Sequence, residues 1–375
     1  MDTFQLENEH LAKVYQKLPV CIVRGKGVLV YDDKGKEYID CMGGYGVAIV
    51  GHCNDKVIKA LKDQLDKLMV CHGSIYNDAR AEFIDKLLKV NPKELNSFYF
   101  GNSGAEAVEF ALKVARKKSG KMGVIAMVGS FHGKTLGALS VTYSQKYRSI
   151  FEPLLQGVKF VKYGKVEEVE KALDVSFGSV IVEPIQGESG IHIPPKNYLY
   201  ELRKLCDDKG LILILDEVQT GFGRTGEFWC FQHEKIIPDV VCSAKGIGGG
   251  FPLSVTIAKK DIMDSLDLGE HTSTFGGNPL ACKAASAALD ALIEDKLIEN
   301  AKKMGEYFLK RLEEIKEKHK IVREVRGLGL MIGVELRFEV KDVILKALER
   351  GVIMLYSGKN VLRFLPPLVI EERHI

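Results

Sequence analysis

The sequence predicts an α/β protein in which a large domain, built on a largely parallel sheet wrapped by helices, is followed by a smaller α+β domain. From about residue 80, helical patterns alternate with short runs that are apolar throughout. Such runs are typical of strands buried on both faces of a parallel sheet. After about residue 278 the pattern changes to long helices with a charged outer face and then short strands. The length of 375 residues fits one large domain with a smaller one beside it.

The expected elements up to about residue 242 follow in order along the chain. Residues 28–39 form two β-rich runs around Asp33-Lys34-Gly35, which predicts a β-hairpin. Residues 105–118 predict a helix, because apolar residues recur at helical spacing and Gly120 stands just past the end. Five apolar runs predict strands of the large sheet: 124–128, 158–161, 179–182, 211–215 and 240–242.

The C-terminal part of the chain predicts a mixed domain. Its expected elements are long helices at 278–319, a strand at 328–336, a helix near 341–350 and strands near 352–356 and 361–365. A helix is expected to start at 371–375, so we expect the chain to lack a few C-terminal residues. We therefore predict an N-terminal segment at 1–40 that packs with the small domain, a large domain at 41–277 and a small domain at 278–375.

Charge and composition exclude several classes of protein. The 53 basic and 50 acidic residues give a net charge of +3 and are spread along the chain, unlike the clustered basic face of a nucleic-acid-binding protein. No apolar run reaches the ~18 residues of a membrane span, and the first residues do not resemble a signal peptide. The eight cysteines contain no Cys-x-x-Cys pair, which indicates reduced thiols in place of disulfides or a metal site. We expect a cytoplasmic protein that does not bind nucleic acid, a membrane or a metal ion.

Two polar motifs stand directly after predicted strands. Asp216-Glu217 lies at the carboxyl end of an apolar run, where ligands bind in open α/β sheets. Lys245 follows the next predicted strand and precedes the glycine-rich stretch 246–250. A buried lysine has a lowered pKa and can act as a Schiff-base nucleophile, and glycines let the backbone approach a flat ligand closely. The order of lysine and glycines does not match a P-loop.

Two further motifs complete a candidate site. The loop 101–106 leads into the helix predicted at 105–118, and free N–H groups at a helix N-terminus bind phosphate. Phe131 follows another strand and can cover a flat ring. Taken alone, each motif also has an ordinary explanation as a turn or helix cap, an exposed loop or a core aromatic. Together they predict a phosphorylated aromatic ring with an aldehyde for the lysine and a ring nitrogen for the aspartate, which describes pyridoxal 5′-phosphate (PLP).

Over nearly its whole length the chain resembles the class III, fold-type I PLP-dependent aminotransferases, and among them the acetylornithine and ornithine aminotransferase subgroup. That subgroup includes enzymes that act on lysine or ornithine tethered to an amino-group carrier protein. The resemblance rests on nine motifs in the family's order: 51–52, 101–106, 131–133, 182–188, 216–221, 244–246, 273–279, 326–330 and 362–367. It implies a mostly parallel, seven-stranded sheet in a PLP-binding large domain.

The resemblance implies a role for each matching cofactor residue. Lys245 would form the Schiff base and move the proton, and Asp216 would pair with the pyridine nitrogen, so these two are the implied catalytic residues. Gln219 would contact the ring hydroxyl, Val218 would pack beneath the ring and Phe131 would stack on its outer face. The other implied residues bind the phosphate (Ser103, Gly104, Ala105), support Gln219 or the substrate (Glu183), and reach the phosphate of the neighbouring subunit's cofactor (Thr274). The last role implies a homodimer with shared active sites.

The resemblance also implies substrate-binding residues. Arg363 matches the arginine that binds the α-carboxylate of 2-oxoglutarate and glutamate, and Glu188 matches the acid that pairs with it until glutamate displaces it. The chain departs from the family at Lys134, where an arginine usually holds the far carboxylate, because lysine lacks the planar fork. Tyr45 matches a tyrosine that contacts the donor's α-carboxylate in the ornithine enzymes. Lys134 and Tyr45 are therefore candidates for the donor carboxylate, although Tyr45 also fits a pocket-wall aromatic and Arg363 a surface ion pair.

The sequence thus predicts a ping-pong aminotransferase that exchanges the terminal amine of an N-blocked ornithine or lysine, acetylated or bound to an acidic carrier protein, with 2-oxoglutarate. It would act in arginine or lysine biosynthesis. Alternatives within the family are an ornithine or 4-aminobutyrate aminotransferase and a glutamate semialdehyde aminomutase. The aminomutase would not need 2-oxoglutarate, so Arg363 and Glu188 count against it. A PLP-binding regulator is disfavoured because no DNA-binding module is evident. A dinucleotide-dependent oxidoreductase is disfavoured because no Gly-x-Gly-x-x-Gly follows the first strand.

Overall fold

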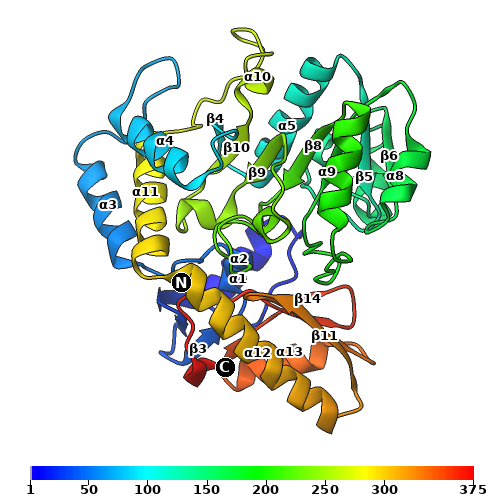
Figure 1. Ribbon diagram of the computed structural model, residues 1–375. Helices are drawn as coiled ribbons and strands as arrows, with labels where there is room; N and C mark the ends of the chain where they lie inside the picture. The colour runs from blue at the N-terminus through cyan, green and yellow to red at the C-terminus, as the bar shows by residue number, and fades with distance from the viewer. Residues whose placement is uncertain (1) are drawn as a thin grey trace.

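Three β-sheets organise the chain in the computed structural model, which describes residues 2–375 (Figure 1). The largest has seven strands in the order β4-β10-β9-β8-β7-β5-β6. Their bounds are β4 (Ser97–Gly101), β5 (Gly123–Met127), β6 (Val158–Val161), β7 (Phe177–Val182), β8 (Ile212–Asp216), β9 (Val240–Ser243) and β10 (Ser254–Ala258). Strands β5 to β9 pair in parallel, and β10 is antiparallel to both β4 and β9. The predicted seven-stranded, mostly parallel sheet is therefore confirmed.

The apolar runs form strands because both faces of this sheet are covered. Every residue of β5, β7, β8 and β9 is buried. Along β8, Leu213 and Leu215 join one hydrophobic cluster whereas Ile212 and Ile214 join another, as the period of two in a strand requires. The five predicted strands are confirmed, while β4 and β10 are the two that the apolar pattern did not identify.

Helices surround the large sheet on both faces (Figure 1). The predicted helix at 105–118 is α5 (Gly104–Ser119), which packs against β7 to β10. The others are α2 (Gly43–Gly46), α3 (Asp55–Leu65), α4 (Asp78–Val90), α6 (Leu136–Ser140), α7 (Gln145–Arg148), α8 (Val166–Ala172), α9 (Tyr198–Lys209), α10 (Lys260–Met263) and α11 (Pro279–Glu294). Short 3-10 helices lie at η1 (Ser149–Phe151), η2 (Cys230–Glu234) and η3 (Lys245–Gly248).

The C-terminal part forms a four-stranded sheet in the order β11-β12-β15-β14, with α12 (Leu297–Lys318) packed against β11 and β12. The strands are β11 (Val322–Leu328), β12 (Met331–Leu336), β14 (Leu355–Ser357) and β15 (Val361–Phe364), and α13 (Lys341–Glu349) follows β12. The strand predicted at 328–336 is confirmed as β12 over 331–336, but its start is wrong, because a turn at Gly329, whose φ is 56°, separates β12 from Leu328 at the end of β11. The helix expected at 371–375 is only the 3-10 turn η4 (Glu372–His374).

The N-terminal segment shares a sheet with the C-terminal part. It contains α1 (Thr3–His10), β1 (Ile22–Lys26), β2 (Leu29–Asp32) and β3 (Glu37–Asp40), and the β2–β3 pair is the predicted hairpin. Strand β3 pairs in parallel with β13 (Val352–Ile353). In Figure 1 the blue strand β3 lies beside the red end of the chain, below the large sheet. The exact domain boundaries stay a prediction.

Within residues 2–375, no helix combines the length and apolar character that crossing a bilayer requires.

Candidate active site

All the predicted site residues except Thr274 and Arg363 line one cavity of about 950 Å³. It lies where the carboxyl ends of parallel strands meet, because Phe131 follows β5, Asp216 ends β8 and Lys245 follows β9. Ser103 adds the N-terminus of α5, which follows the antiparallel edge strand β4. Motifs that are far apart in the sequence are thus brought to one edge of the sheet, as expected for a ligand site in this class of fold.

The loop between β4 and α5 has the features of a phosphate site. Ser103 is the N-cap of α5, and its Oγ accepts a hydrogen bond from the Glu106 N–H at 3.3 Å. The first N–H groups of a helix have no partner within the helix and carry its positive dipole end. A Cβ on Gly104 would lie 2.8 Å from Cγ1 of Val218. Glycine is therefore required for the loop to approach Val218 so closely.

Asp216 is buried at the end of β8 and held from two sides. Its Oδ2 lies 2.7 Å from Nδ1 of His132, and its Oδ1 accepts the Val218 N–H at 3.0 Å. The His132 ring and the Asp216 carboxyl group thus form one buried hydrogen-bonded pair. The His132 main chain is fixed in turn by its N–H bond to Oγ1 of Thr142 at 2.9 Å. The sequence indicated His132 only as part of a motif, with no role of its own.

Lys245 begins η3 directly after β9, in a left-handed conformation with φ of 48°. For a residue other than glycine this conformation costs about 1–3 kcal/mol and is found where the surroundings enforce it. Here a Cβ on Gly246 would lie 2.9 Å from the Ile49 side chain, so tight packing pins the next residue. Burial lowers the pKa of Lys245, and the positive charge of Arg363 lowers it further. Among residues 2–375 its ammonium has no hydrogen-bond partner.

The glycine-rich stretch after Lys245 has a different role from the one expected. A Cβ on Gly246 would meet Ile49, and one on Gly249 would meet Ala288 at 2.8 Å. Only Gly250 of the stretch lines the cavity. Gly246 and Gly249 therefore serve to pack η3 against the rest of the protein, whereas Gly250 borders the cavity.

Two buried carboxyl groups flank Asp216. Glu183 accepts the N–H of Phe131 at 2.9 Å and that of Gly187 at 3.2 Å, and burial raises its pKa to about 7. In the described part of the chain it makes no hydrogen bond to Gln219, so its contacts position Phe131 instead. Burial also raises the pKa of Glu217 to about 7. Its carboxylate bonds the Thr220 hydroxyl and the N–H groups of Cys230 and Phe231.

The expected Arg363–Glu188 pair is present. Arg363, on β15, is fully buried, and its Nη1 lies 2.7 Å from Oε2 of Glu188. Its Nη2 donates to the side-chain oxygen of Gln219 at 3.2 Å, and its Nε is buried without a partner in residues 2–375. A surface ion pair is therefore excluded. Glu188 is about one-third exposed, at 35%, and lines the cavity.

Tyr45 reaches the cavity from a turn with a left-handed backbone conformation. Gly44 and Tyr45 both have positive φ, 58° and 61°. The turn is anchored by Asp40, whose Oδ1 accepts the N–H groups of Met42 and Gly43 at 2.9 Å each and whose Oδ2 lies 2.7 Å from Nε2 of His52. Tyr45 is half exposed, and burial followed by the negative charge of Glu188 raises its pKa.

The mouth of the cavity contains residues that the sequence did not indicate. They are aromatic or amide side chains from the N-terminal segment, α7 and β14: Tyr15, Gln16, Tyr147 and Tyr356. The Tyr356 hydroxyl donates to the side-chain oxygen of Gln16 at 2.6 Å. None of these residues follows a strand of the large sheet or lies in a glycine-rich loop, so no local signal marked them.

Thr274 is not brought into the cavity of its own chain. It is exposed on the segment before α11, next to Phe275, which is also exposed. The structure therefore separates Thr274 from the other predicted cofactor residues.

The residues of the cavity fit PLP. The N-terminus of α5 suits the phosphate, the buried Asp216 suits a protonated ring nitrogen, and the amine of Lys245 has a lowered pKa that suits Schiff-base chemistry. Val218 and Phe131 line the cavity and provide apolar walls for a ring. Within residues 2–375, no three side chains of His, Cys, Asp or Glu gather as a metal site would require.

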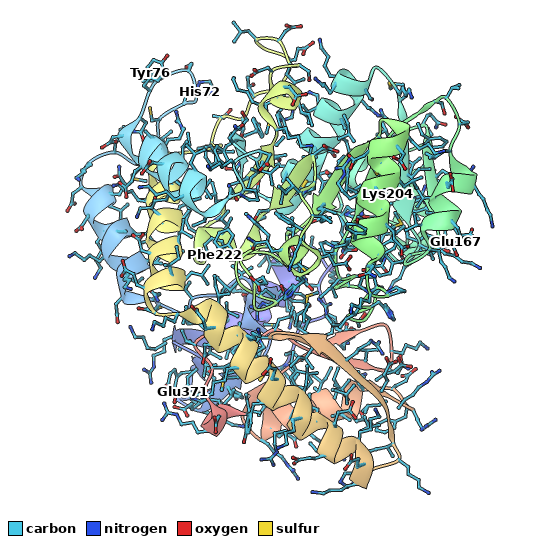
Figure 2. The ribbon with its side chains drawn as sticks, viewed as in Figure 1. His72, Tyr76, Glu167, Lys204, Phe222 and Glu371 are labelled. Atoms are coloured by element: carbon cyan, nitrogen blue, oxygen red, sulfur yellow. The ribbon has the colours of Figure 1, made fainter. Side chains whose placement is uncertain are left out.

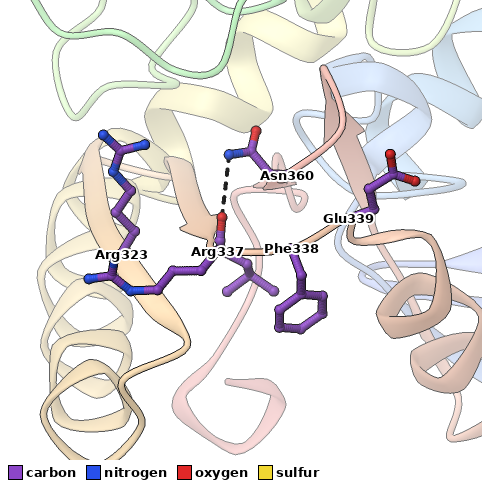
Figure 3. A pocket seen from close by; sticks show the side chains of 6 residues that line it. Arg323, Arg337, Phe338, Glu339 and Asn360 are labelled. Atoms are coloured by element: carbon purple, nitrogen blue, oxygen red, sulfur yellow. Dashed lines mark hydrogen bonds between the residues drawn. The ribbon is translucent and has the colours of Figure 1, made fainter.

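A second hollow, of about 460 Å³, lies on the C-terminal domain and is lined by Arg323, Leu336, Arg337, Phe338, Glu339 and Asn360 (Figure 3). The Asn360 amide donates to the main-chain oxygen of Leu336 at 3.3 Å. None of the predicted site residues lines this hollow.

A known protein family matches nearly the whole of this chain. The family described as Aminotransferase class-III matches residues 10–375. The acetylornithine aminotransferase of Methanopyrus kandleri is 46% identical over 374 residues, which cover 99% of this chain and 95% of that protein. The ornithine aminotransferase of Toxoplasma gondii, solved with PLP at partial occupancy in its active site, is 34% identical with a TM-score of 0.95, covering 99% of this chain and 90% of that one. The acetylornithine aminotransferase of Elizabethkingia anophelis is 33% identical with a TM-score of 0.88, covering 99% and 94%.

Proposed function

The chain belongs to the class III aminotransferases and is a PLP-dependent enzyme, and from this premise we propose that it exchanges the terminal amine of N-acetylornithine with 2-oxoglutarate. The products are a semialdehyde and glutamate, as a step of arginine biosynthesis. The observation that carries the proposal is the buried Arg363 paired with Glu188 at 2.7 Å. The shared identity with acetylornithine aminotransferases supports the choice of donor.

The cofactor residues are proposed to have separate roles in proton transfer and in binding PLP. PLP supplies the electron sink that makes a proton on the substrate carbon labile. The Lys245 amine removes and returns that proton, and the Asp216 carboxylate, held by His132, keeps the ring nitrogen protonated. The remaining residues bind the phosphate or enclose the ring: Ser103, Gly104, Ala105, Val218, Gln219 and Phe131.

Arg363 and Glu188 are proposed to let one site accept two kinds of amine. With an ω-amine in place, Glu188 neutralises Arg363, so no substrate carboxylate is required there. With glutamate in place, the α-carboxylate displaces Glu188 and takes the guanidinium fork. The first product leaves before the second substrate binds, so ping-pong kinetics are expected.

Lys134 and Tyr45 are proposed to receive the carboxylate of the donor. Both line the cavity. Burial, and then the negative charge of Glu188, raises the pKa of the Tyr45 hydroxyl. A phenol that stays protonated at neutral pH can donate a hydrogen bond to a carboxylate, and the lysine supplies the charge.

A homodimer is proposed because Thr274 belongs to an exposed apolar surface. Figure 2 shows His72 and Tyr76 at the periphery, in the loop between α3 and α4. That loop exposes five large apolar side chains: Leu68, Met69, Val70, Ile75 and Tyr76. Arg80 joins it to the Thr274 segment, because its guanidinium donates to the main-chain oxygens of Cys71, Ile75 and Gly277. A second copy placed there would cover this surface, and would bring Thr274 to its neighbour's cofactor site.

The donor is tested by single-turnover bleaching of the bound cofactor's absorbance with N-acetylornithine, N-acetyllysine, free ornithine, 4-aminobutyrate and a carrier-linked lysine. We expect N-acetylornithine to react with the highest second-order rate constant. A preference for free ornithine, 4-aminobutyrate or the carrier-linked lysine would overturn the choice of donor. Lys245→Ala should abolish both turnover and the absorbance of the internal Schiff base, whereas a coloured, active variant would refute the role of the lysine.

A further inference from the structure

Lys134 has no carboxylate partner among residues 2–375, although it lies at the cavity and is exposed. Its close contacts are aromatic. The ammonium lies 4.7 Å from the centre of the Tyr147 ring and 6.0 Å from that of Phe131. A lysine cation is attracted to the face of an aromatic ring, and distances of up to about 6 Å are effective.

The Tyr147 ring is itself held in place. It packs edge-to-face on Phe131, with centroids 6.1 Å apart and planes at 82°. Its main-chain N–H donates to the Ser144 oxygen at 3.0 Å at the start of α7. The ring is half-buried, and burial followed by the charge of Glu188 raises the pKa of its hydroxyl, so the phenol stays neutral.

A lysine in this place needs such support. Its flexible stem carries a point charge and must lose rotamer freedom to bind a carboxylate, whereas the planar guanidinium of an arginine is already organised as a fork. A ring that restricts the ammonium beforehand lowers the cost of ordering it when the substrate arrives.

We infer that Tyr147 is a positioning residue whose ring holds the Lys134 ammonium ready for the far carboxylate of the substrate. This inference rests on the proposed function, because it deepens the role given there to Lys134. The substrate class that it predicts is an amine with a carboxylate remote from the reacting nitrogen.

The test compares two donors that differ only in the carboxylate: N-acetylornithine and 4-acetamidobutylamine, the same molecule without it. The variants are Tyr147→Leu, Tyr147→Phe, Lys134→Met and the double variant Tyr147→Leu/Lys134→Met, each loaded with PLP and checked by its cofactor absorbance. In single turnover, Tyr147→Leu should raise the apparent Kd for N-acetylornithine about two- to fivefold, the change expected of an exposed cation–π contact. The rate constant at saturation should not change.

The controls separate positioning from shape. Tyr147→Phe keeps the ring and should bind N-acetylornithine like the unmodified protein. Tyr147→Leu should leave 4-acetamidobutylamine unaffected, and it should have no further effect on N-acetylornithine once Lys134 is Met. An equal loss with both donors, or additive effects in the double variant, would overturn the inference and leave Tyr147 as a wall of the cavity.

A parallel measurement keeps the inference testable if the proposed donor is wrong. Glutamate also has a far carboxylate, and 2-aminobutyrate lacks it. Tyr147→Leu should weaken glutamate binding, with the same dependence on Lys134, and should spare 2-aminobutyrate. Failure of N-acetylornithine to bleach the cofactor would reject the proposed donor alone, whereas an unchanged Kd for glutamate in Tyr147→Leu would reject the positioning role.

Discussion

Glu188→Gln is expected to shift the enzyme's preference from the ω-amine donor toward glutamate. The amide keeps the shape of the side chain but removes its charge. Arg363 then stands without a counter-ion, since its other side-chain contact is the neutral Gln219. An unpaired cation repels the protonated ω-amine and stays open to any carboxylate.

The size of the effect follows from the geometry of the pair. Two unit charges about 4 Å apart interact by about 4 kcal/mol at an effective dielectric constant near 20. Arg363 is fully buried but Glu188 is 35% exposed, so water screens part of this interaction. We discount the value to about 1–2 kcal/mol, which corresponds to a factor of about 5 to 30.

Stopped-flow bleaching measures each half-reaction separately. The second-order rate constant for N-acetylornithine should fall by about 5- to 30-fold, because Arg363 is no longer neutralised. Glutamate no longer has to displace a carboxylate, so its apparent Kd should fall. Equal losses in both half-reactions, or weaker glutamate binding, would refute the competition between Glu188 and the substrate carboxylate. Unchanged cofactor absorbance and thermal unfolding would show that the variant is folded.

Three further predictions concern the cofactor end of the site. Gly104→Ala should weaken PLP binding by about 1–3 kcal/mol, because its Cβ would press on Val218. Titration of the apoenzyme with PLP measures this, and in a Val218→Ala background the same Gly104→Ala change should cost less. Asp216→Asn should lower kcat by about 10²–10³-fold at saturating PLP, and an unchanged kcat would contradict its role at the ring nitrogen. Glu217 has a pKa of about 7 in the folded protein, above its ordinary 4.5. The stability that its protonation contributes is therefore fully present below about pH 4.5 and is lost as the pH rises through about 7. Glu217→Gln should therefore show a smaller fall in the free energy of unfolding across that window, measured with denaturant, and an unchanged slope would argue against the raised pKa.

The fold class and the position of the cofactor residues could be predicted from local sequence. Runs such as 211–215 are apolar throughout because both faces of the sheet are covered, and that pattern is visible without any contacts. Asp216 and Lys245 could be placed together because each follows such a run and the carboxyl ends of parallel strands meet at one edge. The split of 328–336 by Gly329 was missed, since an apolar run around a single glycine is equally typical of one strand with a bulge.

The substrate end of the site was decided by tertiary structure. Arg363 comes from β15 and Glu188 from the loop after β7, and only the family resemblance, not their spacing, paired them. His132 became the partner of Asp216, and Tyr147 came to lie on Lys134, without any signal in the sequence around them. Hydrophobic periodicity and turn residues reflect interactions between residues that are close together in the sequence. A contact between two residues that are far apart in the sequence leaves no such local pattern. The role of such a residue is therefore evident only in the tertiary structure, where the two residues meet.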